Sequence, residues 1–71
     1  MYLLSQDKKN LIEFERLEFS KAFGTYSITA HGRGDTNWVS VASYDNEEQA
    51  RAEFNHIIEA LKLGQIVYEV R

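Results

Sequence analysis

Hydrophobic and polar residues alternate along two stretches near the middle of the chain. In residues 26–31, Tyr26, Ile28 and Ala30 alternate with polar side chains, and residues 38–44 continue with the same period. A period of two residues is typical of β-strands that bury one face. These stretches therefore predict two strands.

The residues between these strands predict a β-hairpin with one favoured register. Pairing Gly32 with Asn37 leaves a four-residue loop from Arg33 to Thr36. A slip of one residue would pair apolar with polar positions, so this register is favoured over its neighbours. It predicts the pairs Ala30–Val39, Ile28–Val41, His31–Trp38 and Thr29–Ser40.

The period changes to about 3.6 residues after the hairpin and predicts a helix over residues 46–63. Asp45 is expected at the N-cap, and Glu48 completes a capping-box pattern three residues later. Gly64 is expected at the left-handed position after the helix. One buried face is predicted from Ala50, Phe54, Ile57, Ile58 and Leu61.

Shorter apolar runs towards both ends of the chain predict further strands. Residues 2–5 and 11–14 are expected to form a first hairpin. Residues 17–20 are expected to continue the sheet before a turn at residues 21–24. Residues 66–70 predict a final strand after the helix.

Together these elements predict one α+β domain over residues 1–71. We expect two layers: an antiparallel meander of about four or five strands, and helix 46–63 packed on one face. A single helix covers only one face of a sheet, so the other face stays open. That face is predicted to carry Ser27, Thr29, His31, Trp38, Ser40 and Ala42.

Composition and charge narrow the classes of function. The chain has 71 residues, 44% of them apolar, and no cysteine, which indicates one small core without disulfides. The sequence shows neither a signal peptide nor a membrane span, and we expect a cytoplasmic protein. A net charge of -3 argues against binding to nucleic-acid phosphates or to anionic membranes.

Arg33-Gly34-Asp35 is the tripeptide that adhesive proteins show to integrins. Glycine and aspartate are also typical turn residues, because glycine reaches positive φ and aspartate bonds to its own backbone. Without cysteines or an export signal, we expect a hairpin turn and no integrin binding.

No catalytic, cofactor or metal site is predicted, and we expect the protein not to be an enzyme. His31 and His56 belong to different elements and have no cysteine partners, whereas a metal site needs three or four converging ligands. No nucleophile elbow or phosphate-binding glycine loop occurs. The acidic residues are expected to be solvated or paired along the helix: Glu13, Glu15, Glu18, Glu47 with Arg51, and Glu59 with Lys62.

The aromatic residues carry the remaining functional signal. Tryptophan and tyrosine are enriched at interface hot spots, and an open face of small residues around one tryptophan suits contact with another protein. The alternative is that Trp38 only shields His31 in a cross-strand pair. The candidate interaction surface comprises Trp38, His31, Thr29, Ser40, Phe23 and Tyr44.

We therefore predict a non-catalytic protein-interaction module that uses the open sheet face or an edge strand, with an unknown protein partner or a second copy in a homodimer. A chain this short gains stability by self-association. The alternative is a nucleic-acid-associated accessory protein in which aromatic side chains on a sheet stack on bases.

Four short motifs resemble those of a known group of proteins. They are the opening YLLSQD, the helix entry YDNEEQA, the run IIEAL and the closing VYEV. In these motifs the chain resembles small uncharacterised proteins of Gram-positive bacteria and their phages. The resemblance implies a bacterial or phage intracellular setting and assigns no functional residue.

Overall fold

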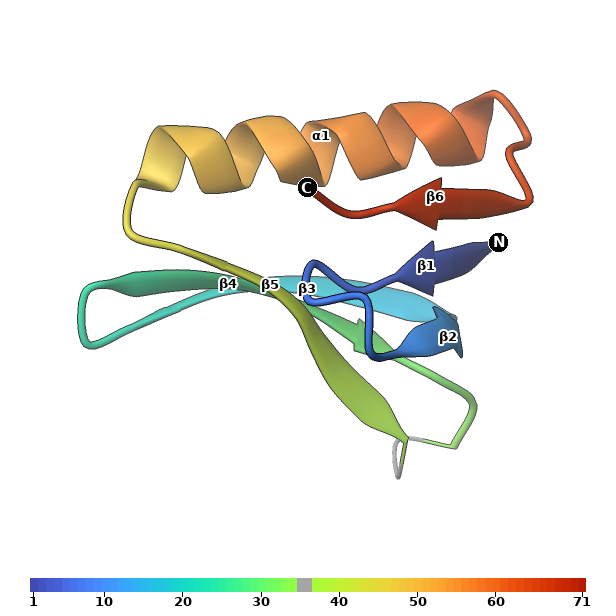
Figure 1. Ribbon diagram of the computed structural model, residues 1–71, viewed down its shortest axis with the longest axis horizontal. Helices are drawn as coiled ribbons and strands as arrows, with labels where there is room; N and C mark the ends of the chain where they lie inside the picture. The colour runs from blue at the N-terminus through green and yellow to red at the C-terminus, as the bar shows by residue number, and fades with distance from the viewer. Residues whose placement is uncertain (35–36) are drawn as a thin grey trace.

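The computed structural model describes residues 1–34 and 37–71, which form six strands and one helix. The strands make two three-stranded sheets, in the orders β2-β1-β6 and β3-β4-β5 (Figure 1). The α+β class is confirmed, whereas the single meander is replaced by two sheets. In chain order the elements are β1 (Tyr2–Leu4), β2 (Leu11–Glu13), β3 (Arg16–Ala22), β4 (Thr25–His31), β5 (Trp38–Tyr44), α1 (Glu47–Lys62) and β6 (Val67–Glu69).

The first sheet joins both ends of the chain. β1 pairs antiparallel with β2, as the predicted first hairpin requires, and parallel with β6. Leu3 at the centre of β1 lies opposite Ile12 on one side and Tyr68 on the other. Parallel neighbours need a crossover connection, which the intervening strands and α1 supply. The final strand thus pairs with the first strand.

The loop between β1 and β2 is built by the side chains of the Ser-Gln-Asp motif. Ser5 is almost fully buried, and its hydroxyl donates to Asp7 Oδ1 at 2.6 Å and accepts from Asn10 N–H at 3.0 Å. Gln6 reaches the other sheet, because its backbone N–H donates to the Val41 carbonyl at 2.7 Å. The motif therefore has a structural role.

β3 and β4 are joined by a tighter turn than the sequence predicts. Ala22 pairs with Thr25, so only Phe23 and Gly24 lie between the strands. Both have positive φ, 53° and 77°, as type I′ hairpin turns require. β3 is therefore longer at both ends than the predicted strand 17–20.

The hairpin of β4 and β5 keeps the predicted register near its turn. Gly32 N–H donates to the Asn37 carbonyl at 2.6 Å, and His31 lies opposite Trp38. The remaining turn residues, Asp35 and Thr36, lie outside the described residues.

A β-bulge then changes the register further along the hairpin. Ile28 lies opposite Ala42, and the predicted pair of Ile28 with Val41 is wrong. The bulge places one extra residue on β5, so Val41 and Ala42 are both buried in the core. It also moves Tyr44 opposite Tyr26, on the face that α1 covers. Ala42 and Tyr44 therefore do not belong to the open face.

Both ends of α1 have recognisable caps, one of them displaced by one residue from the prediction. The N-cap is Asn46, whose Oδ1 accepts from Gln49 N–H at 3.1 Å, and not Asp45. At the other end Gln65 N–H donates to the Ala60 carbonyl, with Gly64 at φ 76° between them. This is a Schellman motif. The predicted pairs Glu47–Arg51 and Glu59–Lys62 are confirmed.

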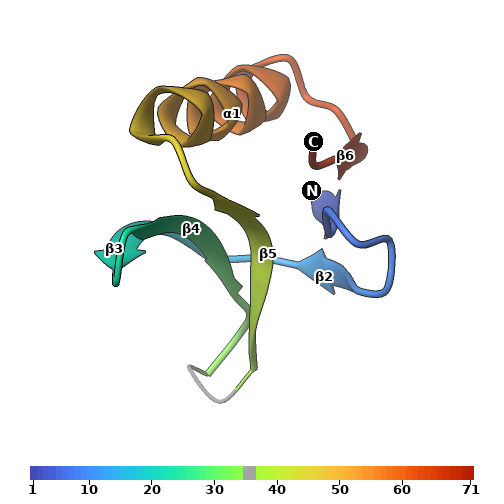
Figure 2. The same ribbon diagram turned by 60° about the vertical axis from the view of Figure 1, so that its left-hand side comes forward.

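The helix covers the side where the two sheets meet (Figure 2). Its buried residues are Ala50, Glu53, Ile57 and Ala60, whereas the predicted stripe member Leu61 is half exposed. The buried side is rotated because α1 also packs beside the last strand. The core shared by helix and sheets consists of Leu3, Ile12, Ile28, Ala30, Val41, Ala42, Ile57 and Val70.

Candidate interaction surfaces

The open face of the β3-β4-β5 sheet carries four of the six predicted surface residues. Thr29 lies opposite Ser40, and His31 lies opposite Trp38. Trp38 is 61% exposed, while the His31 side chain is only 13% exposed. Trp38 therefore remains a candidate contact residue, whereas His31 is largely enclosed by its neighbours.

His31 is held in a chain of polar contacts across the open face. Its Nδ1 lies 3.2 Å from Arg16 Nη2, and its Nε2 lies 2.9 Å from Glu18 Oε1. A guanidinium group can only donate, so Nδ1 accepts and the proton resides on Nε2, which donates to the carboxylate. Both ring nitrogens are thus occupied within the protein.

Phe23 and Tyr44 do not join the other candidates. Phe23 occupies the tip of the β3–β4 turn, where its side chain is fully exposed, and the length of β4 separates it from Trp38. Tyr44 is half-buried and packs against the core beneath α1. The predicted surface is therefore divided between three places.

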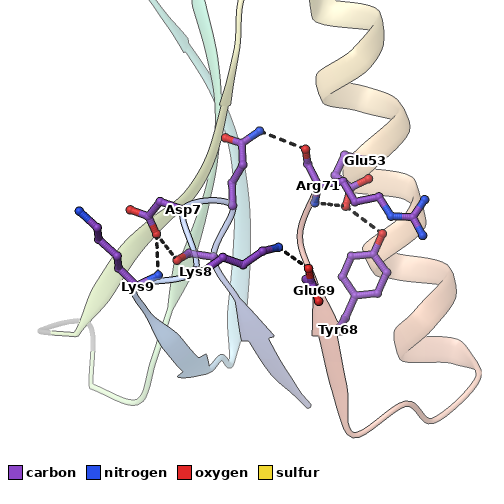
Figure 3. A network of polar contacts seen from close by, with 9 residues as sticks. Asp7, Lys8, Lys9, Glu53, Tyr68, Glu69 and Arg71 are labelled. Atoms are coloured by element: carbon purple, nitrogen blue, oxygen red, sulfur yellow. Dashed lines mark hydrogen bonds and ion pairs between the residues drawn. The ribbon is translucent and has the colours of Figure 1, made fainter.

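A buried carboxylate lies where α1 meets the last strand, a feature that the sequence analysis missed. Glu53 is 6% exposed and accepts hydrogen bonds from Tyr68 Oη at 2.8 Å and from Arg71 N–H at 2.9 Å (Figure 3). His56 Nδ1 lies 3.3 Å from its other oxygen. The signal was available, since Glu53 lies between Ala50 and Ile57 on the helical repeat of the buried face.

Two tyrosines near Glu53 are perturbed. Burial raises the pKa of Tyr44 to about 12, and the negative charge of Glu53 adds to the effect. Burial also raises the pKa of Tyr68 to about 12, with a further contribution from its hydrogen bond to Glu53. The Tyr44 hydroxyl is buried and has no hydrogen-bond partner among the described residues. Glu53 accepts from Tyr68 and Arg71, so its carboxylate links α1 to the end of the chain.

Exposed apolar side chains gather at the junction of α1 and β6. Eight large apolar residues are exposed in the described part of the chain; four of them lie between the end of α1 and the start of β6, and a fifth, Tyr2, lies on the paired strand β1. Leu63 and Ile66, on either side of the turn, are 79% and 76% exposed. Val67 lies opposite Tyr2 in the parallel pair of strands. We call this the α1–β6 surface: Leu61, Leu63, Ile66, Val67 and Tyr2.

Two other kinds of site are not observed within residues 1–34 and 37–71. No three His, Cys, Asp or Glu side chains converge there to hold a metal ion. The helix in this part of the chain lacks the length and hydropathy needed to span a bilayer.

No protein-family model, curated protein or solved structure matches the chain. The resemblance to small proteins of Gram-positive bacteria and their phages accordingly stays a prediction, as does their intracellular setting.

Proposed function

We propose that this chain is a non-catalytic protein-interaction module that uses the α1–β6 surface. The observation that carries the proposal is that five of the eight exposed large apolar side chains of the described residues belong to the end of α1, the turn after it, the start of β6 and the paired strand β1. Contiguous apolar patches on a protein surface mark interaction sites when they exceed a few hundred Å². Single exposed apolar residues, such as Trp38 and Phe23, need no such explanation.

The position of this surface also supports the proposal. Leu63 and Ile66 flank the Schellman turn, whose backbone is fixed by two hydrogen bonds, from Gly64 N–H and from Gln65 N–H. Val67 and Tyr2 lie on paired strands. A surface held on rigid elements loses little conformational entropy when a partner binds, and this favours affinity.

The proposal is tested by affinity capture from the native host with three forms of the chain. Ile66→Asp places a charge on the α1–β6 surface, and Trp38→Ser removes the exposed aromatic from the opposite sheet as a matched control. We expect Ile66→Asp to lose a partner that the original chain and Trp38→Ser both retain. Light scattering of the same three proteins shows whether that partner is a second copy. Identical capture and identical mass for all three would contradict the proposal.

A further inference from the structure

We propose that β6 binds an extended peptide segment of a partner protein as an added strand along its outer edge. This inference rests on the proposed interaction function and names the kind of partner. β6 lies at the edge of the β2-β1-β6 sheet. Edge strands present unpaired N–H and C=O groups that another extended chain can pair with.

The hydrogen bonds to β1 show which groups of β6 remain free. The Ile66 carbonyl accepts from Tyr2 N–H at 2.8 Å, and Val70 N–H donates to the Leu4 carbonyl at 3.0 Å. In a parallel ladder the backbone groups of alternate residues point to opposite sides of the strand. The N–H and C=O groups of Val67 and Glu69 therefore point away from β1, and no other described residue bonds to them.

Arg71 confirms this direction, because its N–H belongs to the same alternate set. The Arg71 N–H donates to Glu53 Oε2 of α1 at 2.9 Å. The helix therefore lies along the outer edge of β6 and already satisfies one end of it (Figure 3). The free part of the edge is limited to Val67 and Glu69, which suits a short segment of about three or four residues at the usual strand rise.

Open space lies beside these free groups. A hollow of about 400 Å³ is bordered by Val67, Glu69 and Arg71. A second hollow of about 250 Å³ continues between β6 and α1, where it is bordered by Ala60 and Leu63 and by the polar residues His56, Glu59, Gln65 and Arg71. Both are bordered by Tyr68 as well, so they adjoin each other. An added strand would place its backbone in the first hollow and one side chain in the second.

The lining of the second hollow is mixed. Ala60 is buried and small and Leu63 is exposed and apolar, whereas the other lining residues are polar: His56, Glu59, Gln65, Tyr68 and Arg71. A side chain of the bound segment that faces α1 would therefore meet both apolar and polar groups.

A longer strand edge is less suitable. β3 offers seven residues, but it carries the cationic residues Arg16 and Lys21. Cationic side chains on an edge strand are a common protection against pairing with another chain.

The edge of β5 is also less suitable, because Gln6 already covers it. The Gln6 N–H donates to the Val41 carbonyl, and Ser43 N–H donates to the Gln6 side chain.

The test uses a library of random linear peptides displayed on phage and selected on the full chain. The synthetic peptide from the strongest clone is then titrated by calorimetry against the original chain and two variants. Val67→Pro removes the outward N–H without removing a bond to β1, since proline is tolerated where the N–H faces out from a sheet edge. Val67→Thr keeps the N–H and the shape of the side chain.

We expect Val67→Pro to weaken peptide binding by about tenfold or more and Val67→Thr to change it by less than about threefold. Equal affinity for all three proteins would overturn strand addition. Thermal unfolding of the variants shows whether each one folds.

Hydrogen exchange of the original chain provides a readout that needs no variant. The selected peptide is expected to slow exchange at the amides of Val67 and Glu69. Unchanged exchange at both amides, or a selection that yields no binding peptide, would overturn the inference.

The failure of strand addition would not by itself contradict the proposed interaction function. If Ile66→Asp abolishes peptide binding while Val67→Pro leaves it unchanged, the α1–β6 surface binds through side chains and strand addition is wrong. If neither substitution changes the affinity for the peptide, strand addition is wrong and the α1–β6 surface does not bind the peptide.

Discussion

Glu53 is the residue whose surroundings depart most from its chemical type. Carboxylates are seldom buried, because removing the charge from water costs several kcal/mol unless it is compensated. Here the compensation comes from the Tyr68 hydroxyl and the Arg71 N–H, both donated by the last strand and the residues after it. The carboxylate consequently ties α1 to the end of the chain.

The first prediction concerns the removal of this carboxylate. Glu53→Ala leaves the part-buried Tyr68 hydroxyl and Arg71 N–H without their acceptor, so we expect the free energy of unfolding to fall by about 1–3 kcal/mol. Denaturant unfolding measures this value. The control is Glu59→Ala, an exposed position on the same helix, which should change stability by less than about 0.5 kcal/mol. Equal effects of the two substitutions would contradict a structural role for Glu53.

The second prediction concerns pH. The pKa of Tyr44 and of Tyr68 is raised to about 12, above the ordinary tyrosine value of about 10. The folded state therefore holds these protons more tightly than the unfolded state. Their contribution to stability is complete below pH of about 10 and is lost as pH rises towards 12. Alkaline titration of tyrosinate absorbance should show two late ionisations, and Tyr68→Phe should remove one of them. Ionisation of every tyrosine near pH 10 in the folded protein would contradict this.

At the scale of elements, the short strands are stabilised mainly by what covers their edges and ends. Gln6 covers part of the edge of β5, since it bonds to Val41, to Ser43 and, through its amide, to the Arg71 carbonyl at 3.1 Å. At β6 the cover is limited to the residue after the strand, because Arg71 N–H donates to Glu53 of α1, and β3 carries the cationic residues Arg16 and Lys21. The turn between β3 and β4 is less favourable, because Phe23 has a positive φ that suits glycine or asparagine better.

The third prediction follows from this turn. The Phe23 side chain is fully exposed, so it contributes little packing, while its φ of 53° costs a bulky residue about 1 kcal/mol. Phe23→Asn creates the Asn-Gly pair favoured in type I′ turns, and we expect the free energy of unfolding to rise by about 1 kcal/mol. Phe23→Val is the control, because a β-branched residue fits positive φ poorly and should give no gain. A loss of stability in Phe23→Asn would show that the phenyl ring makes contacts worth more than the backbone strain.

At the scale of the whole molecule, one core joins two sheets that share no ladder. Leu3 and Ile12 come from the first sheet, Ile28 and Val41 from the second, and Ile57 from α1. The backbone passes from one sheet to the other between β2 and β3, where Glu15 N–H donates to the His31 carbonyl. Because all these elements bury side chains in a single cluster, we expect them to unfold together.

The fourth prediction tests this cooperativity. Leu3→Ala removes a fully buried side chain at the centre of β1 and should lower the free energy of unfolding by about 2–5 kcal/mol. Hydrogen exchange should then show the same loss of protection in β4 as in β1. Leu11→Ala, at a half-exposed position on β2, is the control and should have a much smaller effect. Retained protection in β4 would indicate two independently folding sheets.

The periodicity of the sequence alone determined the elements and most of the hairpin register. The alternation in residues 26–31 and 38–44 predicts β4 and β5, and the turn pairing of Gly32 with Asn37 is confirmed. Local physical chemistry is sufficient there, because strand alternation and helix end signals act over a few residues. The α+β class and the helix are confirmed for the same reason.

Only the tertiary structure decided the features that depend on residues far apart in the chain. The parallel pairing of β6 with β1 joins opposite ends of the sequence, and no local pattern specifies that partner. The bulge beside Ile28 depends on how Val41 and Ala42 both pack into the core. The helical repeat places Glu53 on the buried face, but only the tertiary structure supplies its hydrogen-bond donors, Tyr68 and Arg71. The α1–β6 surface likewise exists because two sheets and one helix leave that corner uncovered.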